Sequence, residues 1–154
     1  MYQVLLALHS ATRWLVLGSL LLAISKGIQG YRRGKIFSKA DNRLRHITAT
    51  IAHVQLMIGY TLYFTSPLIT FFRNNFSEAK KEIGYLFFGL IHIILMTTAI
   101  ILITIGSAIS KRKPTDTSKY LTITLWYSIA LLIIFIAIPW PFSPFAGRPL
   151  IRAF

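Results

Sequence analysis

Residues 83 to 109 read Ile83-Gly-Tyr-Leu-Phe-Phe-Gly-Leu-Ile-His-Ile-Ile-Leu-Met-Thr-Thr-Ala-Ile-Ile-Leu-Ile-Thr-Ile-Gly-Ser-Ala-Ile109 and contain no Asp, Glu, Lys or Arg. A helix needs only about 20 predominantly apolar residues to cross a hydrocarbon core. Three further apolar segments run from Val4 to Ile24, from Ile47 to Phe64 and from Leu121 to Ile138. Aromatic residues at the ends of the two shorter segments can lie at headgroup level and extend them. The sequence therefore predicts an all-α transmembrane bundle of four helices.

The composition of the 154-residue chain agrees with a membrane location. Hydrophobic residues make up 55% of the sequence and charged residues only 14%, whereas about 25% of a typical soluble domain is charged. This balance excludes an ordinary soluble enzyme. The chain has no cysteine, which excludes disulfides, covalently attached haem, thiolate zinc sites and iron–sulfur clusters.

The net charge of +13 predicts an orientation in the membrane. Basic residues fall in short runs between the apolar segments, and no amphipathic element carries them on one face, so we expect no nucleic acid partner. Eleven of them lie near the connections after the first and third segments: Lys26, Arg32, Arg33, Lys35, Lys39, Arg43, Arg45, Lys111, Arg112, Lys113 and Lys119. Five lie on the other side: Arg73, Lys80, Lys81, Arg148 and Arg152. The positive-inside rule places the larger group in the cytoplasm, which predicts an up-down-up-down bundle with both termini outside (N-out/C-out).

The chain is expected to form a single domain, residues 1–154, with helices over about residues 4–26, 44–66, 83–110 and 120–138. Ser38 and Asp41 are placed to cap the second helix. The residues after the fourth helix, 139–154, contain four prolines and are predicted to form an irregular outer C-terminal cap. We expect a multi-pass protein of the bacterial inner (cytoplasmic) membrane, in contact with the lipid bilayer.

All four acidic residues, Asp41, Glu78, Glu82 and Asp116, lie in the predicted connections. Their position argues against a proton relay or cation site that depends on carboxylates within the membrane. The sequence also contains no catalytic triad pattern, glycine-rich phosphate loop or His-x-x-x-His zinc motif. Hydrolase and nucleotide-binding functions therefore have no support.

Histidines, in contrast, occur inside three of the four predicted helices, as His9, His53 and His92. Ionisable residues within a membrane helix are costly and are functional candidates by default, although each one alone can serve as an interhelical hydrogen bond. At about 1.5 Å per residue, His9 and His92 lie about 25 and 28 Å from the basic anchors of their helices, and His53 only about 12 Å. The first and third helices are diagonal in such a bundle, so His9 and His92 are predicted as axial ligands of a haem b iron. A pair that includes His53, and a bundle without haem, remain alternatives.

Arg13 follows His9 by four positions and so shares its helical face. Because no carboxylate occurs in any predicted span, its expected partner is an anion that the protein does not supply. A haem propionate is one such anion, and lipid phosphates in the outer leaflet are the other. The repeats His53-x-x-x-Met57 and His92-x-x-x-Met96 leave open a minor alternative in which copper is bound by imidazole and thioether groups.

Nearly the whole chain resembles a family of small four-helix bacterial membrane proteins that is usually labelled cytochrome b. The resemblance is carried by Leu8-His-Ser-Ala-Thr-Arg-Trp-Leu-Val-Leu17, His53-Val-Gln-Leu-Met-Ile-Gly-Tyr-Thr-Leu-Tyr-Phe64, Leu102-Ile-Thr-Ile-Gly106 and Ile138-Pro-Trp-Pro-Phe142. It implies haem b, electron transfer, and roles for His9, Arg13, His53 and His92. The four-helix layout and the early Leu-His are also similar to membrane-bound protoporphyrinogen oxidase and to four-helix copper-resistance proteins. The third-helix lysine of that oxidase has no counterpart between Ile83 and Ile109.

These features predict a b-type haem-binding integral membrane protein that exchanges electrons with quinol or a periplasmic partner. They favour an electron-transfer protein or subunit over a stand-alone enzyme. A second hypothesis is a cofactor-free accessory or assembly subunit of a larger membrane complex, whose histidines form interhelical hydrogen bonds. A third is a copper-handling or porphyrin-oxidising membrane protein. The presence or absence of a haem spectrum in the purified protein distinguishes the first hypothesis from the second.

Overall fold

The computed structural model describes residues 1–150, and within them the protein is helical without any β-strand. The helical segments are α1 (Tyr2–Arg32), α2 (Lys39–Thr65), α3 (Pro67–Asn74), α4 (Phe76–Ala79), α5 (Ile83–Leu86), the π-helical segment η1 (Phe87–Ile91), α6 (His92–Arg112) and α7 (Asp116–Ala137). The segments α5, η1 and α6 follow one another without a break and form one long helix, Ile83–Arg112.

Four helices are long and apolar enough to cross a membrane: Tyr2–Arg32, Lys39–Thr65, Ile83–Arg112 and Asp116–Ala137. Large apolar side chains such as Leu15, Met57 and Leu132 are more than half exposed on their outer faces, which suits contact with lipid tails. The prediction of an all-α, four-helix membrane protein is confirmed.

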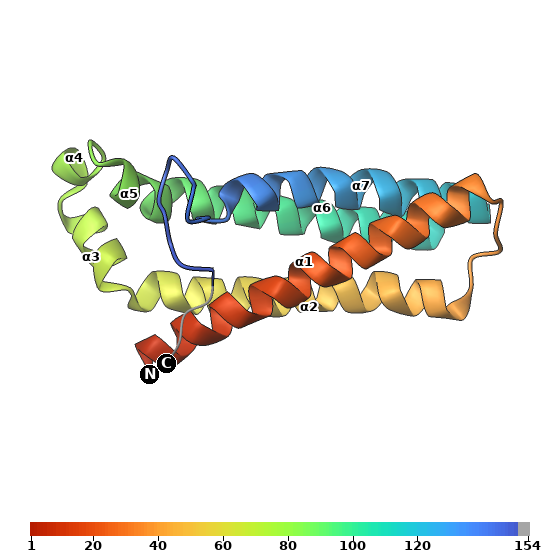
Figure 1. Ribbon diagram of the computed structural model, residues 1–154, viewed down its shortest axis with the longest axis horizontal. Coiled ribbons are helices and arrows are strands. Elements are labelled where there is room, and N and C mark those ends of the chain that lie inside the picture. Colours follow the sequence, from red (N-terminus) through yellow and green to blue (C-terminus); the bar gives the residue numbers. More distant parts are fainter. Residues whose placement is uncertain (151–154) are drawn as a thin grey trace.

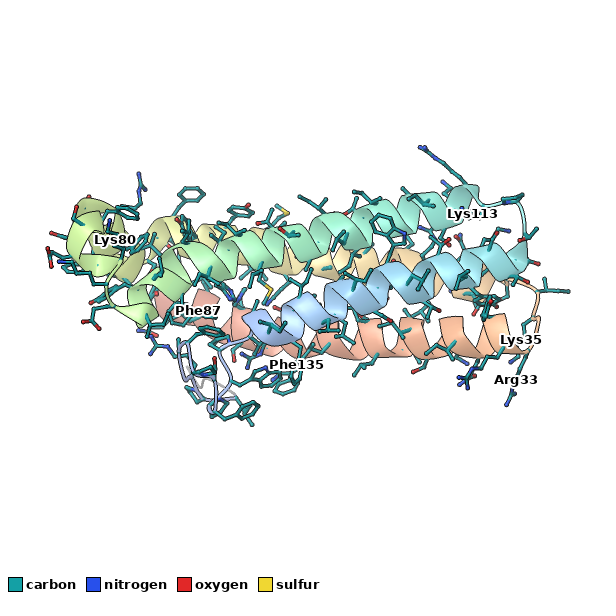
Figure 2. All side chains as sticks on the ribbon, turned by 90° about the horizontal axis from the view of Figure 1, so that it is seen from above. Arg33, Lys35, Lys80, Phe87, Lys113 and Phe135 are labelled. Atoms are coloured by element: carbon teal, nitrogen blue, oxygen red, sulfur yellow. The ribbon has the colours of Figure 1, made fainter. Side chains whose placement is uncertain are left out.

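The four long helices run up-down-up-down, and each packs against two others. α1 lies against α2 and α7, and α6 lies against α2 and α7, so that α1 and α6 are diagonal (Figure 1). The connections α1–α2 and α6–α7 share one end of the bundle, where Figure 2 shows Arg33, Lys35 and Lys113. We call this the basic end. The opposite end carries Lys80 and the short helices α3 and α4. We call it the cavity end, because the cavity described below lies there.

Helices α1 and α2 are longer at the basic end than the apolar pattern predicts. α1 continues to Arg32 and stops before Gly34, whose φ of 57° is in the left-handed region that favours glycine. α2 begins at Lys39 because Ser38 and Asp41 form a capping box, in which the Asp41 N–H donates to Ser38 Oγ (3.2 Å) and the Ser38 N–H donates to Asp41 Oδ2 (3.0 Å). The predicted cap is confirmed, and it lies outside the purely apolar stretch.

Small residues allow the helices to approach closely toward the basic end. Gly30 lies against the ring of Tyr120, and Gly106 lies against Trp126, so that a methyl group at either glycine would clash with the aromatic ring. Membrane helices pack in this way because lipid tails compete with large apolar side chains but not with close backbone contacts. The contacts of α7 with α1 and with α6 are therefore tight in this half of the molecule.

A buried arginine ties three helices together at the same end. Arg45 of α2 is 6% exposed, and its guanidinium donates to Asn42 Oδ1 (2.8 Å) and to the carbonyl oxygen of Ser107 (3.0 Å) in α6. The Tyr127 hydroxyl of α7, itself fully buried, donates to the Arg45 carbonyl oxygen (2.9 Å). Within residues 1–150, all the hydrogen-bond partners of this guanidinium are neutral.

The cavity end is closed by segments without a long helix. α3 begins with Pro67 as its first residue, and its Phe72 packs on Gly89 of η1. After α7, residues 138–150, which we call the C-terminal segment, contain no helix and return across the end of the bundle toward α1 (Figure 1). Residues 151–154 of the predicted cap lie outside the described residues.

Candidate functional site

A cavity with a volume of about 220 Å³ lies between α1, α2 and α6 at the cavity end. A single buried water needs only about 10–15 Å³, so the cavity has room for a ligand many times larger than water. Its lining is mainly apolar, with Leu, Ile and aromatic side chains. The polar side chains on its wall include His9, Arg13, Gln55, Tyr60, Tyr63, His92 and Arg148.

The structure brings His9 and His92 together across the diagonal of the bundle. Their ring centroids are 6.4 Å apart, with an angle of 70° between the ring planes. The two residues come from helices that are not neighbours in the bundle, so their side chains meet inside it. The prediction that His9 and His92 lie at one depth is confirmed.

Each imidazole has a ring nitrogen free to bind a ligand. The Nδ1 atom of His92 lies 2.8 Å from the carbonyl oxygen of Ala137, at the end of α7. This contact fixes the tautomer with the proton on Nδ1, which leaves the Nε2 lone pair as the acceptor. His9 forms no hydrogen bond through its ring to any residue among 1–150, and its Nδ1 is fully buried. Buried polar atoms without a partner are rare and indicate a missing ligand or a strained site.

The π-helical segment η1 sets the direction of His92. It ends at Ile91, so that His92 is the first residue of regular α-helix after it. A π segment inserts one extra residue in a helix and rotates the next turn relative to the preceding one, and such segments occur often at functional sites. The Tyr63 hydroxyl donates to the Gly89 carbonyl oxygen (2.9 Å) and thereby holds η1 against α2.

His9 is held against α2 by a glycine and a glutamine. A methyl group at Gly59 would lie 3.2 Å from His9 Cε1, so only glycine leaves the imidazole its present position without strain. Gln55 Nε2 donates to the His9 carbonyl oxygen (2.9 Å), and Gln55 Oε1 accepts from the Thr12 hydroxyl. Gln55 and Gly59 together determine the position of His9 relative to α2.

Arg13 lies one turn beyond His9 on the same wall of the cavity. Its Nη2 donates to the Leu150 carbonyl oxygen of the C-terminal segment, while its Nε is buried without a partner among residues 1–150. A second arginine, Arg148, also lines the cavity, and its guanidinium carbon lies 5.1 Å from the centre of the Phe88 ring. No Asp or Glu is among the described residues that line the cavity.

The separation of the two imidazoles fits one metal ion between them. Metal–imidazole bonds are about 2.0–2.1 Å long, and a ring nitrogen lies about 1.1 Å from the ring centre, so two imidazoles on opposite sides of one ion have centres roughly 6 Å apart. The 6.4 Å between His9 and His92 matches this arrangement. Within residues 1–150, no group of three or more His, Cys, Asp or Glu could hold a metal ion. Two imidazoles alone suit an iron whose other positions are filled by a porphyrin, so the donor set fits haem.

His53 lies elsewhere in the fold. Its Nε2 is 3.0 Å from the Thr104 hydroxyl of α6, on the exposed side of the α2–α6 contact, and it does not line the cavity. The two His-x-x-x-Met repeats do not converge either, since Met57 is 71% exposed whereas Met96 lines the cavity. Of the four residues singled out in the sequence, the structure therefore brings together His9, Arg13 and His92.

Several residues of the site are not predicted from the sequence. Gln55 is detectable as a polar side chain within an apolar span, and Gly59 as a glycine one turn after it. No sequence pattern predicts that Arg148 belongs to the site, because its position depends on how the C-terminal segment folds back. Comparisons of the chain with protein-family models, with curated proteins and with solved structures find no match. The assignment of the site therefore depends on its geometry.

Proposed function

We propose that the protein binds one haem b in this cavity, with His9 and His92 as axial ligands, and that it serves electron transfer. The observation that carries the proposal is the 6.4 Å separation of two imidazoles on diagonal helices, both at the wall of one apolar cavity. The resemblance to the family labelled cytochrome b points in the same direction. Bound haem would supply a one-electron iron couple.

The chain's own residues contribute orientation, charge and burial. The Ala137 carbonyl oxygen orients His92 and increases the basicity of its free nitrogen. Arg13 places a positive charge one helical turn from His9, where it counters the negative charge of a bound anion. The apolar walls limit access of water, which influences the reduction potential.

The charge distribution supports an orientation in a bacterial inner membrane. Under the positive-inside rule the basic end faces the cytoplasm, and both termini and the cavity end face outward. A haem in that position lies in the outer half of the membrane, within reach of quinol in the lipid phase or of a periplasmic redox protein. We therefore propose one of these as the electron-transfer partner.

A haem spectrum of the purified protein tests the proposal. Protein isolated in mild detergent from haem-supplied cells should show a Soret band that shifts on dithionite reduction, with the split visible bands of a low-spin haem. His9→Ala and His92→Ala should each abolish the low-spin spectrum. His53→Ala is the matched control, because His53 contacts Thr104 outside the cavity, and we expect its spectrum to equal that of the wild type.

Three outcomes would contradict the assignment. Colourless protein from haem-supplied cells would refute haem binding and favour a cofactor-free subunit. An unaltered low-spin spectrum in His9→Ala or His92→Ala would refute the ligand pair. Stoichiometric copper in metal analysis, lost on Met96→Leu, would favour the copper alternative.

A further inference from the structure

Two arginines at the cavity wall have no acidic partner among the residues that line it. Arg13 comes from α1 and Arg148 from the C-terminal segment, and both residues line the cavity. Arg13 is partly buried and Arg148 is exposed, so neither cation is cut off from water. Two positive charges on one cavity wall without an acidic residue give that wall a positive potential, which favours a ligand with more than one negative charge.

The position of Arg148 is determined by the packing of the C-terminal segment. The Phe145 ring stacks on the Phe87 ring with 5.8 Å between centroids and 4° between planes, and Phe87 in turn contacts the His92 ring. The Arg148 N–H donates to the Pro139 carbonyl oxygen (3.2 Å), which closes the segment into a loop. Arg148 is thus held at the cavity by the same aromatic residues that surround His92, and Figure 2 shows Phe87 beside this segment.

Arg13 retains hydrogen-bonding capacity toward the cavity. A guanidinium has five N–H donors in a planar fork that matches a carboxylate. Only Nη2 has an acceptor within residues 1–150, the Leu150 carbonyl oxygen, and Nε is buried without one. Since Leu150 follows Arg148 by two residues, the C-terminal segment contacts one arginine and carries the other.

We propose that Arg13 and Arg148 form an anion-binding end of the cavity that takes two carboxylates on one apolar ligand. The inference rests on the proposed function for the identity of that ligand, since haem is a flat apolar dicarboxylate. Arg148 is then a binding residue, and the C-terminal segment is part of the binding site and not merely an outer cap. The imidazoles hold the metal and the arginines hold the carboxylates.

Porphyrins that differ only in charge or in iron test this site separately from the histidines. The probes are haemin, iron-free protoporphyrin IX and protoporphyrin IX dimethyl ester, whose carboxylates are neutral, each titrated into detergent-solubilised full-length protein. Iron-free protoporphyrin IX should bind the wild type about tenfold or more tightly than the ester, because charge-assisted hydrogen bonds are lost in the ester. Arg148→Gln and Arg13→Gln should each weaken protoporphyrin IX and haemin about tenfold and leave the ester unchanged.

Matched variants separate charge from folding. Arg73→Gln removes an exposed arginine of α3 at the same end that does not line the cavity, so its affinities should equal those of the wild type. Arg148→Lys should restore part of the affinity, since it keeps the charge but not the fork.

Equal binding of protoporphyrin IX and its ester by the wild type would overturn the two-arginine site even if haemin gives a low-spin spectrum. Charge-dependent binding of protoporphyrin IX without a low-spin haemin spectrum would uphold the site and refute the histidine ligation. Failure of every probe to bind would refute both.

Discussion

Gly59 of α2 lies directly against the His9 imidazole, and a methyl group at this position would be 3.2 Å from His9 Cε1. Such a distance is closer than ordinary van der Waals contact. The close approach couples the helix packing of α1 and α2 to the direction of a candidate ligand. It also supplies a variant that disturbs ligation without removing any ligand atom.

Gly59→Ala should weaken haemin binding and disturb the low-spin spectrum, because the added methyl displaces His9 at a cost of about 1–3 kcal/mol. Alanine is the better helix former by about 1 kcal/mol, which offsets part of this cost, so we expect the ligand-free protein to lose at most about 2 kcal/mol of stability. Haemin titration and thermal unfolding in detergent measure the two effects. Gly18→Ala is the control, since nothing lies within 4 Å of a methyl group at Gly18. Identical haemin affinity for both variants would show that Gly59 does not position His9.

Gln55→Leu should loosen the attachment of His9 to α2. The substitution removes the hydrogen bond that Gln55 donates to the His9 carbonyl oxygen and the one that it accepts from the Thr12 hydroxyl, each worth about 0.6 kcal/mol between membrane helices. We expect thermal stability to fall by about 1 kcal/mol and the reduction potential of bound haem to change. Thr61→Val is the control, because among the described residues the Thr61 hydroxyl donates only within its own helix, to the Met57 carbonyl oxygen. A Gln55→Leu protein with an unchanged potential would limit Gln55 to helix packing.

Arg45→Met should destabilise the bundle by about 1–3 kcal/mol, because Asn42 and Ser107 lose a charged donor in a buried position. Arg45→Lys should also destabilise it, since an ammonium cannot reach both partners as the planar fork does. Thermal unfolding in detergent gives the comparison, with Arg43→Met at an exposed arginine two positions away as the control. Equal stability of the Arg43 and Arg45 variants would contradict the structural role of Arg45.

The absence of cysteine makes the orientation directly measurable with single-cysteine variants. Lys35→Cys and Lys113→Cys at the basic end should resist a membrane-impermeant maleimide in intact cells and react after lysis. Asn75→Cys at the cavity end should react in intact cells. The reverse pattern would place the basic end outside and overturn the proposed orientation.

The sequence predicts the helices of this protein better than their ends or their side-chain contacts. Long apolar runs such as residues 83–109 identify the four candidate spans, since crossing a hydrocarbon core depends only on the length and polarity of a helix. The requirement to cross the membrane does not explain why α1 extends to Arg32. The helix ends there because Gly34 adopts a left-handed backbone conformation. Helices α3 and α4 occupy a connection where no apolar stretch predicts them.

The candidate site divides in the same way. His9 and His92 are predictable because rise per residue converts sequence position into depth. The same conversion places His53 nearer the basic end, and the structure has it beside Thr104. Arg148 is not predictable, since its place depends on Phe145 stacking with Phe87, a contact between distant parts of the chain. The sequence spacing within a helix determines how far along the helix axis a residue lies. The path of an irregular segment such as the C-terminal segment depends instead on tertiary packing.

The glycine contacts toward the basic end have a consequence for the cavity. Gly27 and Gly30 bring α1 close to α7 there, whereas at the other end α1 lies away from α7 and the C-terminal segment occupies the space between them (Figure 1). A helix of this length behaves as a stiff rod, so its crossing angle sets the gap at its far end. The width of the cavity is therefore determined at a distance, by residues that never touch its contents.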